Sequence, residues 1–449
     1  MARPISKCLH DTAQPWAARC DREQMRTRIL YGIGSFGGSL LQQTVLLWVF
    51  YFYAPPAGQG LPLRVTAALL GVALGAGRIV DALADPPIAY LSDRLRLPGG
   101  RRRPFILVGA PLLALAFALL WTPPEGLSPL GNFLYLGTVL GAFYFLFTLV
   151  MNPYTALLPE ITAGGAGRVE TAAWQAGFSL VGTAAAFLAS SALSARVGFA
   201  AMGWVLAPVG CAALWTAALS VRERAVVEPP VDFIPATRAV LRSRPFRIFL
   251  LGLALLWFGL SMVNLSLALV VTVLMGLPRG SVGVVLAGAI AVTLLSFPAI
   301  ARLAQQGGKR RALLATMGLA AVVVPFIGLI GALPLGAPAA WQGYVLIALA
   351  GPPIAGLFVL PNAILADIAE EHAGATGHRS EGMFFALQGL IFNGTTSLAA
   401  VVLGLLLERF GYAPGAALGL RIVPSVAAAS VIAGALVFTR FPSDHGRTA

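Results

Sequence analysis

The stretch GRIVDALADPPIAYLSDRLRLPGGRRRPFIL, residues 77–107, decides how this chain folds. Its first half is an apolar segment interrupted by Arg78, Asp81 and Asp85, whose spacing places them on one face of a helix. Its second half is a short basic loop followed by another apolar run. Ionised groups within an apolar helix, with arginines at its end, are typical of a membrane-crossing hairpin that has a water-lined interior face.

The composition extends this interpretation to the whole chain. Of the 449 residues, 58% are hydrophobic and 11% are charged, whereas soluble domains carry about 25% charged residues. Disordered proteins, coiled coils and disulfide scaffolds are excluded because they need high charge or dense cysteine. The chain is therefore predicted to be an all-α polytopic protein that uses the lipid bilayer in place of a polar surface.

The formal net charge of +13 would indicate nucleic-acid binding in a soluble protein. Here the basic residues lie between apolar spans, so we interpret them as topology signals and expect no nucleic-acid partner. The three cysteines, Cys8, Cys20 and Cys211, are far apart and predict neither a disulfide framework nor a metal site.

Apolar runs of about 20 residues predict twelve membrane spans. In the first half they are 29–53, 65–91, 104–122, 131–158, 170–196 and 199–220. In the second half they are 246–276, 281–303, 311–333, 341–366, 382–407 and 418–440. The domains are then an N-terminal tail, a six-helix bundle, a Pro-containing linker, a second six-helix bundle and a C-terminal tail, at 1–28, 29–220, 221–245, 246–440 and 441–449.

The distribution of basic residues predicts which side of the membrane each loop occupies, because cytoplasmic loops are enriched in Arg and Lys. The predicted cytoplasmic segments hold Arg94, Arg96, Arg101, Arg102, Arg103, Arg168, Arg222, Arg224, Arg238, Arg242, Arg244, Lys309, Arg310, Arg311 and Arg379. The predicted outer loops hold little more than Arg64, Arg196, Arg279 and Arg409. Residues 1–28 show no signal peptide, so both tails are predicted to be cytoplasmic, in a multi-pass plasma (inner) membrane protein.

A weak internal repeat indicates two related halves. The loop LSDRLRLPGGRRRPF at 91–105 follows the second span, and ARLAQQGGKRRALL at 301–314 follows the eighth. Two related six-helix halves are the layout of major-facilitator transporters, so we predict two pseudo-symmetric bundles that work by alternating access.

Asp81 and Asp85 are the sharpest candidates for a functional site. A carboxylate at membrane depth costs at least a few kcal/mol unless it is paired or hydrated. The pair could supply oxygen ligands to Na⁺ or take up a proton, with Arg78 as charge partner. The alternative is a static Arg–Asp pair that locks the helix into the bundle.

Several polar positions near span ends carry further predictions. Asp93 and the run Arg101, Arg102, Arg103 could form a latch between gating states, without contacting solute. Pro153 is expected to break the fourth span beside Thr148 and Asn152, either lining a cavity or forming a packed kink. Further along, Asp367–Glu381 is expected to be a cytoplasmic loop with solvated His372 and His378 that bind no metal, and Glu160 and Glu170 are expected to be solvated.

No motif for covalent catalysis, nucleotide hydrolysis or metal binding is present, so no enzyme activity, metal or cofactor is expected and transport must draw on a gradient. Five motifs, in their order and spacing, resemble the glycoside–pentoside–hexuronide cation symporters, most of all their melibiose-permease branch. They are YGIGSFGGSLLQQTVLLWVFYFY (31–53), residues 77–107 above, NPYTALLPEIT (152–162), RVETAAWQAGF (168–178) and GHRSEGMFFALQGLIFNG (377–394).

This resemblance implies that Asp81, Asp85 and Thr148 bind a coupling cation. It also shows four departures, because Ser39, Met151 (with Asn152 beside it), Gln175 and Asn393 stand where that branch has charged residues. The substrate cavity would thus be lined by the neutral groups Ser39, Asn152, Gln175 and Asn393. A third carboxylate is missing from the cation site, which favours H⁺ over Na⁺ or no coupling at all.

The main hypothesis is a monomeric secondary transporter that moves a small organic solute, by default a sugar or glycoside, together with H⁺ or Na⁺. Two alternatives remain open. One is transport of a lipid or amphipathic metabolite, suggested by the loss of four charges. The other is a membrane assembly or sensor protein that keeps the fold without transport.

Overall fold

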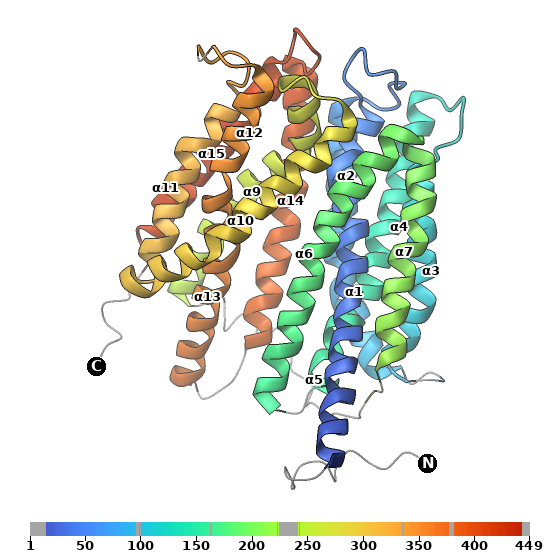
Figure 1. The fold of residues 1–449 in the computed structure, drawn as a ribbon, viewed down its shortest axis with the longest axis vertical. Helices are drawn as coiled ribbons and strands as arrows, with labels where there is room; N and C mark the ends of the chain where they lie inside the picture. Colours follow the sequence, from blue (N-terminus) through green and yellow to red (C-terminus); the bar gives the residue numbers. More distant parts are fainter. Residues whose placement is uncertain are drawn as a thin grey trace.

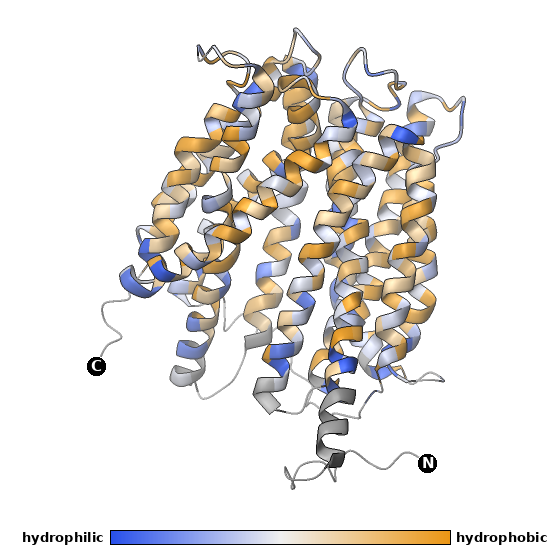
Figure 2. Ribbon diagram, in the orientation of Figure 1, coloured by the Kyte–Doolittle hydropathy of each residue, from blue (hydrophilic) through white to orange (hydrophobic). Residues whose placement is uncertain are grey.

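Long helices make up most of the described part of the chain in the computed structural model (Figure 1). The structure describes residues 15–441 except 96–97, 99, 162–163, 222, 224–240, 242, 335 and 377–380. Within this described part, twelve helices are long and apolar enough to cross a membrane, as predicted. Hydrophobic residues occur along the whole length of these helices (Figure 2).

The first half contains six of these helices and one short one. They are α1 (Pro15–Tyr53), α2 (Ala67–Arg94), α3 (Arg103–Leu120), α4 (Pro129–Ala156), the short α5 (Leu158–Ile161), α6 (Gly164–Arg196) and α7 (Gly198–Ser220). Side-chain oxygens at Thr66 and Ser128 cap the first turns of α2 and α4, where free backbone N–H groups need acceptors.

The second half begins with α9 (Arg244–Leu269), which continues into the π-helical turn η2 (Val270–Leu274). It goes on with α10 (Arg279–Gly307), α11 (Lys309–Ile327), α12 (Ala339–Leu349), α13 (Gly351–Thr376), α14 (Glu381–Phe410) and α15 (Leu418–Phe438). The predicted tenth span, 341–366, is therefore two successive helices, α12 and α13.

Two local predictions are wrong. The segment from Asp367 is not a loop, because α13 continues to Thr376. Ile368 and Ala369 are buried while Glu370 and Glu371 are exposed, so this turn is amphipathic and keeps its apolar side in the bundle. The side chain of His372 and all of His378 lie outside the described residues. Pro153 does not break the fourth helix, since α4 runs on to Ala156. Pro153 and the following Tyr154 are both buried.

The helices pack as two groups. In the first, α1 contacts α6 and α7, and α4 contacts α2 and α3; in the second, α9 contacts α14 and α15, and α11 contacts α13 and α15. The groups meet chiefly where α2 packs on α14 and α6 packs on α10. This arrangement agrees with two predicted bundles; the predicted linker, 221–245, lies mostly outside the described residues.

Small residues bring the two groups together at the upper end of the molecule as drawn in Figure 1. A Cβ at Gly283 of α10 would lie 2.4 Å from the Phe187 carbonyl oxygen of α6, and one at Gly404 of α14 would lie 2.2 Å from the Ala67 carbonyl oxygen of α2. Contacts this close require glycine, as in other tightly packed membrane helices. The two groups are therefore closed against each other at this end.

Candidate functional site

The helix α2 carries Arg78, Asp81 and Asp85 on one face at membrane depth, as the spacing predicts. Arg78 is 2% exposed and Asp81 is 6% exposed, whereas Asp85 is only half-buried. The two carboxylates thus differ in environment, with Asp81 enclosed by protein and Asp85 closer to open space.

The helix α4 supplies one hydrogen-bond donor to each carboxylate. The Thr148 hydroxyl donates to Asp81 Oδ1, and the Asn152 amide donates to Asp85 Oδ1 at 3.0 Å. Asp81 and Asp85 lie one turn apart on α2, and Thr148 and Asn152 lie one turn apart on α4, so the two contacts between the helices are also one turn apart. The structure therefore brings together the predicted cation-site residues, and it places Asn152 on a carboxylate, whereas the sequence suggested a solute-cavity wall.

Arg78 is held by an acid on its own helix and by an aromatic ring on α4. Its Nη1 atom lies 3.5 Å from Asp81 Oδ2, and its guanidinium carbon lies 4.5 Å from the centre of the Tyr144 ring. Cation–π contacts of this kind add attraction where water is excluded. Tyr144 was missed from the sequence, although it lies one turn before Thr148 on the same helix and that spacing could have found it.

The carboxylate pair sits where the close contact between the two groups of helices ends. Above it, the Ser397 hydroxyl of α14 donates to the Gly75 carbonyl of α2 at 2.9 Å, and a Cβ at Gly71 would lie 2.4 Å from the Ala400 carbonyl oxygen. One turn below Ser397 on α14, the buried Asn393 side chain interacts with Asp81. One turn below Asn393, Gly389 is exposed, and no atom of the described residues lies within 4 Å of the position that a Cβ would occupy there.

The other two predicted cavity residues lie within the first group of helices. Ser39 Oγ is 2.7 Å from Ser179 Oγ of α6, and the Gln175 side chain interacts with the hydroxyls of Tyr31 and Tyr154. Neither has a hydrogen bond to Asp81 or Asp85 within the described part of the chain. They are thus placed beside other polar groups of α1, α4 and α6, and not at the carboxylates.

Two of the predicted latch residues, Arg101 and Arg102, form an ionic cluster with a buried acid. Arg101 Nη2 and Arg102 Nη1 donate to Glu160 Oε1 at 2.6 and 2.8 Å. Glu160 is 3% exposed, so the prediction that it is solvated is wrong; the two guanidinium groups compensate its burial. The partly exposed Glu170 pairs with Arg28 of α1. The side chain of Asp93 lies outside the described residues.

A second acid fixes the start of α3. The Glu223 carboxylate accepts hydrogen bonds from the backbone N–H groups of Arg101, of Arg102 at 2.8 Å and of Arg103 at 2.5 Å. These N–H groups precede or begin the helix and have no partner within it. Glu223 follows α7, so its contact ties the basic loop to the end of the first bundle, a function that the sequence did not indicate.

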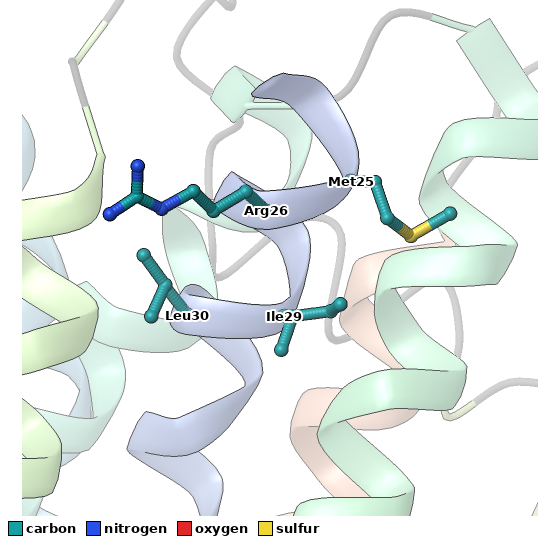
Figure 3. Close-up of a pocket in the computed structure, with 4 residues that line it drawn as sticks. All are labelled: Met25, Arg26, Ile29 and Leu30. Atoms are coloured by element: carbon teal, nitrogen blue, oxygen red, sulfur yellow. The ribbon is translucent and has the colours of Figure 1, made fainter. Parts of the chain in front are cut away.

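A surface depression of about 290 Å³ lies near the start of α1 and is lined by Met25, Arg26, Ile29 and Leu30 (Figure 3). It includes none of the predicted site residues. In the part of the chain that is described, no group of three or more His, Cys, Asp and Glu side chains could hold a metal ion.

Residues 30–444 match the family model of MFS/sugar transport proteins. The chain belongs to this family. An uncharacterized symporter of Bacillus subtilis, YnaJ, is 28% identical over 93% of this chain and 91% of its own length. The isoprimeverose transporter of Lactiplantibacillus pentosus is 23% identical over 90% and 82%. Among solved structures, a mutant of the nucleoside transporter NupG superposes with a TM-score of 0.70 at 12% identity, over 93% of this chain and all of the other.

Membership of the MFS/sugar transport family confirms the predicted fold class and the predicted transporter, as opposed to an enzyme. This member is a multi-pass secondary transporter of the symporter type, acting on small-molecule solutes in a lipid bilayer. The roles of its site residues remain predictions.

Proposed function

We propose that this transporter carries a neutral sugar or glycoside together with one proton, by alternating access between its two bundles. The observation that carries the coupling is the unequal pairing of the carboxylates. Asp81 is balanced by Arg78 at 3.5 Å, whereas Asp85 has no salt bridge within the described residues. With both acids ionised, the three groups sum to one negative charge, so one monovalent cation makes the site neutral.

Asp85 is the group that takes up the proton in this proposal, because it is half-buried and lies next to the end of the α2–α14 contact. Its hydrogen-bond partner is the Asn152 amide, which adds no charge. A proton needs one basic oxygen, whereas Na⁺ needs several oxygen ligands, so this arrangement favours H⁺. Protonation removes the charge of Asp85. It therefore lowers the free-energy cost of the conformational change, during which the site is shielded from water.

The solute class follows from the neutral character of the predicted cavity groups and from the transporter named for isoprimeverose among the relatives. Ser39 and Gln175, which lie away from the carboxylates, offer a hydroxyl and an amide group, which suit a polyhydroxylated neutral molecule. In this proposal the transporter is a monomer in the plasma (inner) membrane with both termini in the cytoplasm, in line with the arginine distribution.

The test is uptake of isoprimeverose and of a panel of monosaccharides and p-nitrophenyl glycosides into proteoliposomes under an imposed pH gradient. Asp85→Asn should abolish accumulation against the solute gradient while keeping solute exchange at equal concentrations. Glu125→Gln, in the exposed loop before α4, is the matched control and should accumulate normally.

Full accumulation by Asp85→Asn would remove the coupling assignment. Flux of a lysophospholipid without flux of any glycoside would support the lipid alternative instead, and absence of flux for every probe would favour a sensor or assembly protein.

A further inference from the structure

The end of α14 lies against the start of α2 at the upper end of the molecule in Figure 1, and an acid of α14 caps α2 there. Glu408, in the last turn of α14, accepts a hydrogen bond from the Ala68 N–H at 2.7 Å. Ala68 lies in the first turn of α2, where backbone N–H groups have no partner within the helix. This turn contains no acidic residue of its own, so its negative charge comes from the second group of helices.

Close packing brings Glu408 to this position. One turn earlier on α14, Gly404 lies so near to α2 that a Cβ would be 2.2 Å from the Ala67 carbonyl oxygen. Residues four apart share one face of a helix, so Gly404 and Glu408 both face the start of α2. A carboxylate at a helix N-terminus is attracted by the partial positive charge of the helix dipole. The contact is therefore an electrostatic attraction between the two groups as well as a hydrogen bond.

A second charged side chain joins the two groups at the same end, on another set of helices. Arg279 is the first residue of α10, and its guanidinium carbon lies 5.8 Å from the centre of the Phe199 ring of α7. Its charge also interacts with the Tyr51 hydroxyl of α1. Phe199 is 3% exposed and its ring stacks on that of Trp121, so the ring is held in place. The first group thus offers an electron-rich aromatic face to a cation of the second.

Both charged residues stand at the end of their own helix that the helix dipole disfavours. Glu408 is an acid in the last turn of α14, and Arg279 is a cation at the first position of α10. Acids are favourable at helix N-termini and cations at helix C-termini, so each residue costs stability within its own helix. Among the described residues, the contacts that offset this cost lie on the first group. This pattern is expected of residues that hold two groups of helices together.

Neither residue has a full opposite charge as its partner within the described part of the chain. The salt bridges between described residues lie within one group each, as for Arg78 with Asp81 and Lys309 with Asp367. The N-terminus of α2 and the ring of Phe199 carry only partial charges. A salt bridge buried between the groups would be costly to break. Contacts with partial charges are weaker, so they can hold this end closed and still let it open.

We propose that Glu408 and Arg279 form an electrostatic clasp, which holds the upper end of the transporter closed and is released each time this end opens. Both charges belong to the second group and both partners to the first, so separation of the groups breaks both contacts. Each contact favours the closed state about two- to fivefold, the range for one charge at a helix N-terminus or over an aromatic ring. The clasp therefore sets the fraction of molecules that can bind solute from this side. The inference rests on alternating access but not on the identity of the solute or the coupling ion.

The test measures how fast Ser397→Cys reacts with a membrane-impermeant maleimide added on the side that this end faces, in a background without the three natural cysteines. Ser397 is 8% exposed and lies in the contact between α2 and α14, so its labelling requires the groups to separate. Glu408→Gln keeps a hydrogen-bond acceptor but removes the charge, and Arg279→Gln removes the cation. Each should be labelled about two- to fivefold faster than the parent protein. The double variant should be labelled faster by about the product of the two factors, because the contacts are separate.

Each variant has a control of the same chemistry. Glu125→Gln removes an exposed glutamate from the loop between α3 and α4. Arg409→Gln removes an arginine that lies 5.9 Å from the Phe410 ring of its own helix, so both members of that contact belong to one group. Both controls should be labelled at the rate of the parent protein.

Rates of Glu408→Gln and Arg279→Gln equal to those of their controls would overturn the clasp. Labelling of the parent protein in the same experiment would then still show that this end opens, which leaves alternating access intact. If neither the parent protein nor any variant were labelled, this end would not open, and alternating access and the clasp would both be wrong.

Discussion

The Asn152 amide nitrogen lies 3.0 Å from an Asp85 carboxylate oxygen. This contact joins α4 to α2 one turn away from the contact between Thr148 and Asp81. An amide at this position supplies a hydrogen bond without a negative charge, so the site holds two carboxylates where a third could have been accommodated. The identity of residue 152 should therefore set the preference of the site for H⁺ or Na⁺.

Asn152→Asp should make the transporter sensitive to Na⁺. A third carboxylate beside Asp85 adds an attraction of about 4 kcal/mol for a cation 4 Å away at an effective dielectric constant of 20. Even a third of that energy raises the apparent Na⁺ affinity about tenfold. The measurement is the melting temperature of the purified variant in increasing NaCl, with choline chloride at equal ionic strength.

Asn132→Asp is the matched control, because it makes the same substitution on the same helix, near its start and away from Asp85. It should show no specific response to Na⁺. An equal response of both variants would mean that the effect comes from added surface charge and that residue 152 does not adjoin the cation site.

Removal of Arg78 should destabilise the protein more than removal of the whole charge pair. Arg78→Gln leaves Asp81 buried without its counter-charge, and breaking a buried pair in this way costs roughly 3–5 kcal/mol. The N–O distance of 3.5 Å is long for an ion pair, so we expect the lower end of this range. Thermal unfolding of Arg78→Gln, Asp81→Asn and the double variant measures the coupling.

The double variant should recover part of the stability lost in Arg78→Gln, because position 81 then carries no buried charge without its partner. If instead the two losses were additive, Arg78 and Asp81 would not interact, and the balance of charge proposed for the site would be wrong.

Glu160 of α5 and Glu170 near the start of α6 should differ in their contribution to stability. Glu160 is buried between Arg101 and Arg102, whereas the Glu170 side chain is 37% exposed in its pair with Arg28. Glu160→Gln should therefore lower the stability by several kcal/mol and impair transport. Glu170→Gln should cost about 1 kcal/mol or less, as for exposed pairs. Equal melting temperatures of the two variants would contradict the burial of Glu160.

The sequence predicts the helices well because a span is defined by local composition. The start of α14 and the end of α7 lie within a residue of their predicted positions, at 381 and 220. The division between α12 and α13 was missed, since apolar residues continue on both sides of Ala350. The end of α13 is not apparent from the sequence either, because the polarity of Asp367 and Glu371 obscures the apolar face that Ile368 and Ala369 form between them.

The site was predicted in part, for a physical reason. Arg78, Asp81 and Asp85 share one helix, so their spacing alone places them together. Their partners come from other helices, and pairing across helices depends on packing that no local pattern specifies. The burial of Glu160 is a further example, since its partners Arg101 and Arg102 precede it by 59 and 58 residues.

Gly71 should control how readily the two groups of helices separate at the upper end in Figure 1. A Cβ there would lie 2.4 Å from the Ala400 carbonyl oxygen of α14. Gly71→Ala therefore forces α2 and α14 apart in this conformation, at a cost of roughly 1–3 kcal/mol for overpacking. Because the conformation that is open at this end lacks the contact, the population should move towards it by about five- to 150-fold.

The measurement is the labelling rate of Ser397→Cys by a membrane-impermeant maleimide, in a background where Cys8, Cys20 and Cys211 are replaced. Ser397 is 8% exposed and faces α2, so its labelling reports separation of α2 from α14. Gly137→Ala on α4 is the control, since none of the described residues lies within 4 Å of its Cβ position and alanine only improves helix propensity. Gly71→Ala should be labelled several-fold faster than this control. Equal rates would show that the close approach at Gly71 does not hold this end of the transporter closed.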